Sequence, residues 1–121
     1  MELKRDLVKY IRDKAKSKYK KGTECEICGD TVKLDFHHFY SLTRLLDKWV
    51  KEQSLEPYLV MEWREEFIDE HDAELYEYTA TLCHKHHLQL HSIYGKDPLL
   101  STAKKQERWV GIQRDKHGLV W

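Results

Sequence analysis

Two pairs of metal-ligating side chains stand far apart in this sequence. Cys25 and Cys28 are separated by two residues, and Cys83 and His86 repeat that spacing near the middle of the second half. Four such ligands in two pairs leave no position for water, which is typical of a closed structural zinc site. The alternatives are buried cysteines or a redox pair. A redox pair normally follows a strand and opens a helix, whereas Cys25 and Cys28 precede an expected strand, so zinc is favoured.

A second set of candidate ligands consists of histidines. His87 and His91 are four residues apart in an expected helix, so their rings project from one face. With His37 they would form a three-histidine cluster whose remaining coordination positions are open, as a catalytic metal requires. His38, the neighbour of His37, would then be a partner that does not bind the metal.

Hydrophobic periodicity predicts the elements that must position these ligands. Strand formers and alternation indicate a strand from Val32 to Phe36 that ends at the paired histidines, and a second strand over 78–82 that pairs with it. Helical spacing and cap residues predict helices over 2–19, from Ser41 onward, over about 60–70, over 84–94 and over 101–114. We expect core packing from these helices, with Trp63, Phe67, Leu88, Leu90, Trp109, Val110 and Ile112 among the contributors.

Length and charge limit the classes of protein that fit. A chain of 121 residues is expected to form one domain, and its formal net charge is zero. Residues 1–22 carry nine Lys or Arg against three Asp or Glu, whereas residues 42–77 carry four against eleven. No apolar stretch resembles a signal peptide or a membrane span, so we expect a cytoplasmic protein that does not bind membranes.

The order Cys-x-x-Cys, strand, Asp-x-His-His, strand, Leu-Cys-x-x-His-His-x-x-x-His resembles the HNH endonucleases, the ββα-metal nucleases that include colicin DNases and many phage enzymes. The resemblance covers residues 25–91, and its specific parts are residues 35–38 and 82–91. It implies an α+β fold in one domain over 1–121. That domain would have a basic helix at 1–22, a ββα-metal core at 25–38 and 78–94 with its structural zinc, a helical insertion at 39–77, and a C-terminal helix and tail at 96–121.

The resemblance also implies roles for single residues in the metal centres. His37, His87 and His91 match the catalytic metal ligands, and His38 matches the general base. Asp35 would orient His37 or join the metal shell. Cys25, Cys28 and Cys83 match the cysteines of the zinc-knuckle subgroup, and His86 replaces the fourth cysteine. One structural zinc and one catalytic Mg²⁺, Mn²⁺, Ni²⁺ or Zn²⁺ are therefore expected.

One departure from the family pattern concerns the residue that orients the base. The family's central Asn would fall near Tyr78, and this chain contains no Asn. Either Tyr78, Thr79 or a backbone carbonyl takes its place, or the enzyme is slow or inactive.

The expected function is metal-dependent hydrolysis of DNA, by nicking or by double-strand cleavage, with duplex DNA as partner and a protein partner as a possible source of specificity. A phage enzyme would act in the host cytoplasm. An inactive zinc-stabilised DNA-binding or protein-interaction module is the alternative, and a zinc-bearing interaction subunit that uses the acidic middle and the four tryptophans ranks last. The basic ends are either solvated surfaces or phosphate contacts. The candidate contacts are Lys4, Arg5, Lys9, Arg12, Arg44, Lys104, Lys105 and Arg108.

Overall fold

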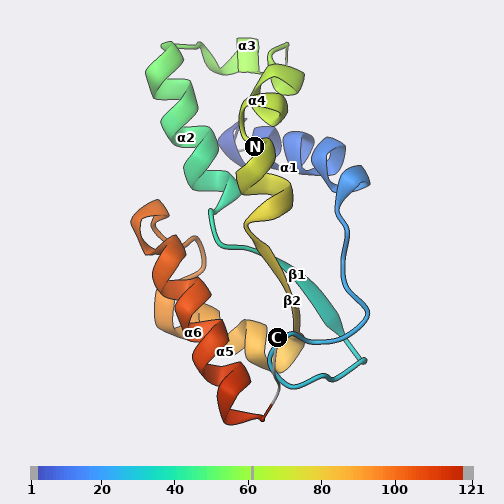
Figure 1. The fold of residues 1–121 in the computed structure, drawn as a ribbon. Coiled ribbons are helices and arrows are strands. Elements are labelled where there is room, and N and C mark those ends of the chain that lie inside the picture. The colour runs from blue at the N-terminus through green and yellow to red at the C-terminus, as the bar shows by residue number, and fades with distance from the viewer. Residues whose placement is uncertain (1–2, 61, 119–121) are drawn as a thin grey trace.

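The computed structural model of the protein describes residues 3–60 and 62–118, without the side chains of residues 3–6, 57 and 58. It is an α+β fold in which a two-stranded sheet lies between two groups of helices (Figure 1). The elements in chain order are α1 (Leu3–Ala15), the 3₁₀ turn η1 (Lys16–Lys18), β1 (Leu34–His38), α2 (Leu42–Gln53), α3 (Pro57–Val60), α4 (Arg64–Glu70), the π-helical turn η2 (Ala73–Glu77), β2 (Thr79–Cys83), α5 (His84–Tyr94), the 3₁₀ turn η3 (Leu100–Thr102) and α6 (Ala103–Lys116).

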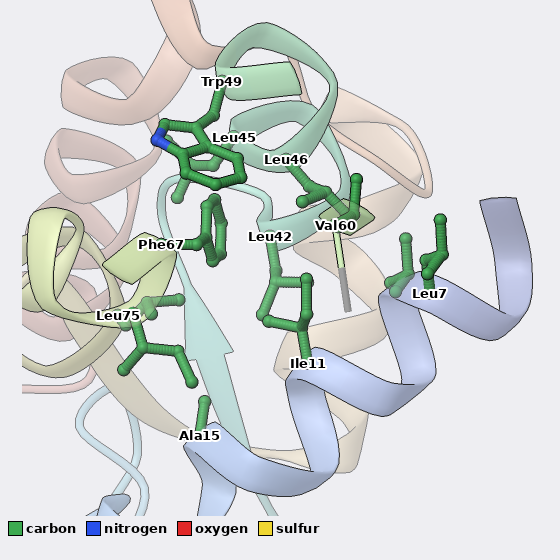
Figure 2. Packing of buried hydrophobic residues seen from close by; sticks show 12 residues of the cluster. Leu7, Ile11, Ala15, Leu42, Leu45, Leu46, Trp49, Val60, Phe67 and Leu75 are labelled. Carbon is green, nitrogen blue, oxygen red and sulfur yellow. The ribbon is translucent and has the colours of Figure 1, made fainter. Parts of the chain in front are cut away.

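The first hydrophobic cluster joins α1 to the helices between the two strands. One face of α1 is apolar at helical spacing, and Ile11 on that face is fully buried. Phe67 of α4 and Leu75 of η2 are also fully buried and lie beside it (Figure 2). The predicted helix after Ser41 is confirmed as α2. As predicted, Ser41 is its N-cap, and its side chain accepts a hydrogen bond from the Arg44 amide. The segment between the two strands is therefore helical and packs against α1.

The sheet consists of β1 and β2 in antiparallel pairing, with Leu34 opposite Cys83 and His38 opposite Thr79. Successive side chains of a strand point to opposite faces, so Asp35 and His37 share one face and His38 lies on the other. The chain passes from Cys83 at the end of β2 directly into α5. The predicted strand pair and the helix that follows it are confirmed.

A second hydrophobic cluster lies around the sheet, α5 and α6. Ile27, Leu82 and Leu90 are fully buried there, and Val110 of α6 is nearly so. The partly buried Tyr40 packs against both clusters. In the described residues no helix combines the length and the apolar character needed to cross a bilayer.

Some sequence expectations about the helices and strands were wrong. The first strand begins at Leu34, and Val32 before it is 62% exposed. Leu88 and Ile112 are exposed although Leu90 and Val110 are buried. Residues two apart on an α-helix point about 200° away from each other, so both members of such a pair cannot face one core. Trp63 immediately precedes α4 and is exposed, so it does not lie on the buried face of that helix with Phe67.

The first helix is also shorter than expected. The α-helix ends at Ala15, and the chain continues to Lys18 as a 3₁₀ turn instead of an α-helix to residue 19. The last helix runs from Ala103 to Lys116, two residues later at each end than the expected 101–114. These shifts leave the order of the predicted elements unchanged, and the structure adds the short helix α3 and the helical turns η1, η2 and η3.

Candidate metal centres and active site

The two Cys/His pairs meet at one point. The ligand atoms of Cys25, Cys28, Cys83 and His86 all lie within 4.8 Å of one another. Cys25 and Cys28 occupy a tight turn in which the amide of Gly29 donates to the Cys25 carbonyl at 2.8 Å. Gly29 has φ of +78°, a conformation that favours glycine. The turn therefore presents both thiols to the pair at the start of α5.

The spacing of these four atoms fits a tetrahedral ion. Zinc–sulfur bonds of about 2.3 Å place two thiolates about 3.8 Å apart in a tetrahedron. The Sγ atoms of Cys28 and Cys83 are 3.9 Å apart, and Nδ1 of His86 lies 3.2 Å from Sγ of Cys83. This Cys₃His cluster can hold a structural metal such as zinc.

The pKa values of Cys25 and Cys28 are shifted in opposite directions. Burial raises the pKa of Cys25, but hydrogen bonds from the backbone amides around it, those of Cys83, Cys28 and Ile27, hold its pKa below the ordinary value. Burial and the neighbouring thiols raise the pKa of Cys28 to about 11. At neutral pH Cys28 would therefore need a bound cation to become a thiolate.

His37, His87 and His91, which we call the histidine cluster, also converge. Their ligand nitrogens lie within 4.8 Å of one another. Nε2 of His87 is 3.2 Å from Nδ1 of His37 and 3.0 Å from Nε2 of His91. Metal–nitrogen bonds of about 2.1 Å place adjacent ligand nitrogens about 3.0 Å apart at right angles and about 3.4 Å apart in a tetrahedron. The rings therefore fit one ion with further positions open.

The outer nitrogens of two of these rings bond to groups that only accept hydrogen bonds. Nδ1 of His87 lies 3.1 Å from a carboxylate oxygen of Asp35, and Nδ1 of His91 lies 2.8 Å from the Gly95 carbonyl. Each Nδ1 must therefore carry the hydrogen, which leaves a lone pair on Nε2. The Asp35 carboxylate also accepts from Nδ1 of His84 at 3.0 Å.

Burial favours the neutral form of two rings of the histidine cluster, those of His37 and His87. Burial lowers the pKa of His37 to about 3, and the neighbouring His87 and His91 act in the same direction. Burial also lowers the pKa of His87, against the pull of Asp35. Neutral rings offer lone pairs, and lone pairs that face one another at 3.0–3.2 Å repel unless a cation lies between them.

His38 lies on the opposite face of β1. Its Nε2 lies 3.0 Å from the carbonyl of Leu75 in η2, and because a carbonyl only accepts, Nε2 carries the hydrogen. The lone pair of the ring is therefore on Nδ1. Burial lowers the pKa of His38 to about 4, with a further contribution from Arg12. The ring is neutral at neutral pH.

Tyr78, the predicted replacement for the family Asn, lies elsewhere. Its side chain is 45% exposed and its ring packs against Tyr40 at 5.6 Å between centroids. Among the described contacts, the group that holds His38 is the carbonyl of Leu75, one of the kinds of partner that the sequence left open.

A cleft of about 270 Å³ joins these groups. It is lined by the histidine cluster and His38, with Arg12 from α1 and Lys96 from the segment after α5 at its sides. A wider, open hollow of about 750 Å³ reaches the same cluster past Asp35 and His84. Both faces of β1 therefore contribute to one solvent-accessible region.

The predicted phosphate contacts are spread over the surface. The side chains of Lys4 and Arg5 lie outside the described residues. Arg12 is the predicted contact that lines the cleft, whereas Nε of Arg44 donates to the carbonyl of Asp97 at 3.0 Å. The others are exposed on α1 or α6, namely Lys9, Lys104, Lys105 and Arg108.

Sequence reasoning missed four groups near the site. Lys96 had a usable signal, because it directly follows the glycine that ends the histidine-bearing helix. His84 stands in the same histidine-rich run as His87. Leu75 contributes through its backbone, and Gln106 lies 69 residues from its partner His37, so neither has a local sequence signature.

The comparisons with known proteins agree with this chemistry. Residues 1–119 match the family model of phage T5 nicking endonucleases, described as the nicking endonuclease family. No solved structure matches the chain. The predicted endonuclease activity on DNA and the resemblance to phage enzymes are confirmed at the level of this family. Because the match spans nearly the whole sequence, the chain belongs to the nicking endonuclease family and is a DNA endonuclease.

Proposed function

We propose that this chain is a metal-dependent nicking endonuclease of the HNH type, in one domain with a ββα-metal core formed by β1, β2 and α5. The histidine cluster would hold one divalent cation, and His38 would be the general base. The observation that carries the proposal is the convergence of three imidazoles, with ring nitrogens 3.0–3.2 Å apart, beside a cleft that His38 also lines. The described residues contain one such cluster, which suits the cutting of one strand per encounter.

A divalent cation bound there supplies Lewis-acid stabilisation of negative charge on the phosphate and the leaving 3′ oxygen. The protein's part is to hold the three rings in place. Asp35 strengthens His87 as a ligand, because a carboxylate that accepts from Nδ1–H makes the opposite nitrogen more basic. Three imidazoles suit Zn²⁺, Ni²⁺ or Mn²⁺, and Mg²⁺ would keep most of its water.

His38 is suited to take a proton from the attacking water. The Leu75 carbonyl fixes the hydrogen on Nε2, so the lone pair of Nδ1 is the proton acceptor. In the free protein burial lowers the pKa of His38 to about 4, which makes it a weak base. A phosphodiester in the cleft would raise the pKa of this imidazole by its negative charge, and a bound divalent cation would act in the opposite direction. The Leu75 carbonyl would thus do the work of the missing Asn.

Arg12 and Lys96 are the best-placed phosphate contacts, because both line the cleft with His38. The remaining exposed basic residues of α1 and α6 would extend the contact along duplex DNA. Phosphate contacts position DNA without reading its sequence. Sequence preference would then come from base contacts or from a second protein.

The Cys₃His cluster would hold zinc as a structural ion. Cys83 ends β2 and His86 lies in the first turn of α5, so the site fixes the start of the helix that carries His87 and His91. Cys25 and Cys28 tie that helix to the turn before β1. The zinc would thereby position the catalytic centre without taking part in the reaction.

A plasmid-nicking assay with zinc-loaded protein tests the proposal. Wild type should convert supercoiled plasmid to the open-circular form with Mn²⁺ or Mg²⁺ and stop with EDTA. The variant His38→Ala should lose about 10²–10⁴-fold in rate, as expected for removal of a general base.

His71→Ala is the matched control. His71 is a half-buried histidine that also bonds a carbonyl, that of Phe67 at 2.7 Å, in the helical insertion. It should keep its activity. Nicking by His38→Ala at the wild-type rate would overturn the base assignment. A folded wild type that binds DNA but cuts with none of these metals would leave the binding module as the function.

A further inference from the structure

Gln106 is a fully buried polar side chain on α6, outside the Cys/His motifs. Its exposed fraction is 0%. Its amide oxygen lies 2.8 Å from Nε2 of His37, and its amide nitrogen lies 3.0 Å from both the Phe39 carbonyl and Oγ1 of Thr102. The whole amide is therefore hydrogen-bonded in the core, next to a residue of the histidine cluster.

The direction of this amide is fixed by its partners. The Phe39 carbonyl can only accept, so the amide nitrogen must face it. The Thr102 hydroxyl gives its own hydrogen to the Leu99 carbonyl at 2.6 Å, and its oxygen is thus left to accept from the same nitrogen. Two independent acceptors place the nitrogen on that side and turn the amide oxygen toward His37.

The tautomer of His37 follows from that orientation. An amide oxygen accepts, so Nε2 of His37 must carry the hydrogen, and the lone pair is on Nδ1. Nδ1 is the atom 3.2 Å from Nε2 of His87. With the opposite tautomer, His37 would turn an N–H toward the other two rings and could not bind the same ion as they do.

We propose that Gln106 is a positioning residue that holds His37 as the Nε2–H tautomer and so aims its Nδ1 lone pair at the catalytic cation. Helix α6 thereby becomes part of the metal centre, although every ligand comes from β1 and α5. Gln106 is neutral, in contrast to Asp35 on His87, so it orients a ring without adding charge. The inference rests on the proposed function of the histidine cluster.

The test uses zinc-loaded protein freed of the second metal, and two readouts that need no DNA. The ¹⁵N shifts of the His37 ring report which nitrogen carries the hydrogen, and calorimetric titration with Mn²⁺ reports affinity. Wild type should show His37 with its hydrogen on Nε2. Gln106→Met, close in size but without the amide, should show both tautomers and bind Mn²⁺ roughly 10–100-fold more weakly.

Val110→Ala is the control for structural damage. Val110 is buried one turn further along α6 and belongs to the second hydrophobic cluster, around the sheet, α5 and α6. It should lower thermal stability yet keep the His37 tautomer and the Mn²⁺ affinity within about twofold.

Three results would count against the inference. A wild-type His37 with its hydrogen on Nδ1 would overturn it without any variant, including the case in which Gln106→Met does not fold. Equal Mn²⁺ affinities of wild type and Gln106→Met would overturn it alone. Wild type that binds no Mn²⁺ would overturn the proposed function as well, so the two failures can be told apart.

Discussion

Asp35 offers a graded test of how the protein tunes the proposed metal ligands. One carboxylate oxygen accepts hydrogen bonds from His87 at 3.1 Å and from His84 at 3.0 Å. These bonds outweigh the effect of partial burial and hold the pKa of Asp35 below its ordinary value. The carboxylate is therefore ionised at neutral pH and acts on His87 through a charge-assisted bond.

The expected loss depends on what replaces the carboxylate. A hydrogen bond to a charged group contributes about 1.5–3 kcal/mol and a neutral one about 0.5–1.5 kcal/mol. The Asp35 side chain is 34% exposed, so solvent reduces the gain to the lower part of these ranges. Asp35→Asn keeps a neutral acceptor and should weaken Mn²⁺ binding about 5-fold, whereas Asp35→Ala should weaken it roughly 10–30-fold at 1.4 kcal/mol per factor of ten.

Calorimetric titration of zinc-loaded protein with Mn²⁺ measures both variants. His84→Gln is the matched control, because it replaces the other imidazole that donates to Asp35 and leaves the bond to His87 in place. It should bind Mn²⁺ within about twofold of wild type. Asp35→Ala with wild-type affinity would refute the reasoning, and so would a loss in His84→Gln as large as that in Asp35→Ala.

Three further predictions concern zinc, pH and DNA binding. Cys83→Ser should release the structural zinc to a chelator and lower the unfolding temperature by more than 10 °C, because structural zinc contributes directly to folding. Metal analysis measures the zinc content and calorimetry the unfolding temperature. Retention of one zinc per chain would contradict the prediction. In chelator-treated protein, His37 and His38 should each lower the free energy of unfolding by about 2 kcal/mol between pH 7 and pH 5. Their folded-state pKa values of about 3 and about 4 lie below the unfolded value, so only the unfolded chain takes up protons in this range. Denaturant titrations that show no change between these pH values would contradict the prediction. Arg12→Gln should weaken DNA binding and reduce the salt slope by about 1, whereas Lys51→Gln on α2 should not; equal slopes for the two variants would remove Arg12 from the interface.

Local chemistry made several features of this fold predictable. Short-range spacing predicts three elements, namely the Cys-x-x-Cys turn, the strand that ends at the paired histidines and the helix from His84 to Tyr94. Gly95, whose φ is +92°, ends that helix. The three-histidine cluster was predicted from the i, i+4 spacing of His87 and His91 on the helix together with His37, and the resemblance implied the same ligands.

The features of the site that the sequence did not predict depend on contacts between segments that are distant in the chain. The Leu75 carbonyl that bonds His38 has no side-chain signature and is placed by the packing of the helical insertion. Gln106 is one glutamine on a helix, and only the docking of α6 against β1 shows that it meets His37. Leu88 is exposed although it is hydrophobic, because it points about 200° away from the buried Leu90 on the same helix.

Anomalous diffraction from crystals of the zinc-loaded protein soaked in Mn²⁺ would show directly whether the histidine cluster holds a cation. We predict one manganese peak at coordination distance from Nδ1 of His37 and from Nε2 of both His87 and His91, and a separate zinc peak among the Cys₃His ligands. A map from nicking-competent protein with manganese bound elsewhere and none between these three rings would contradict the account.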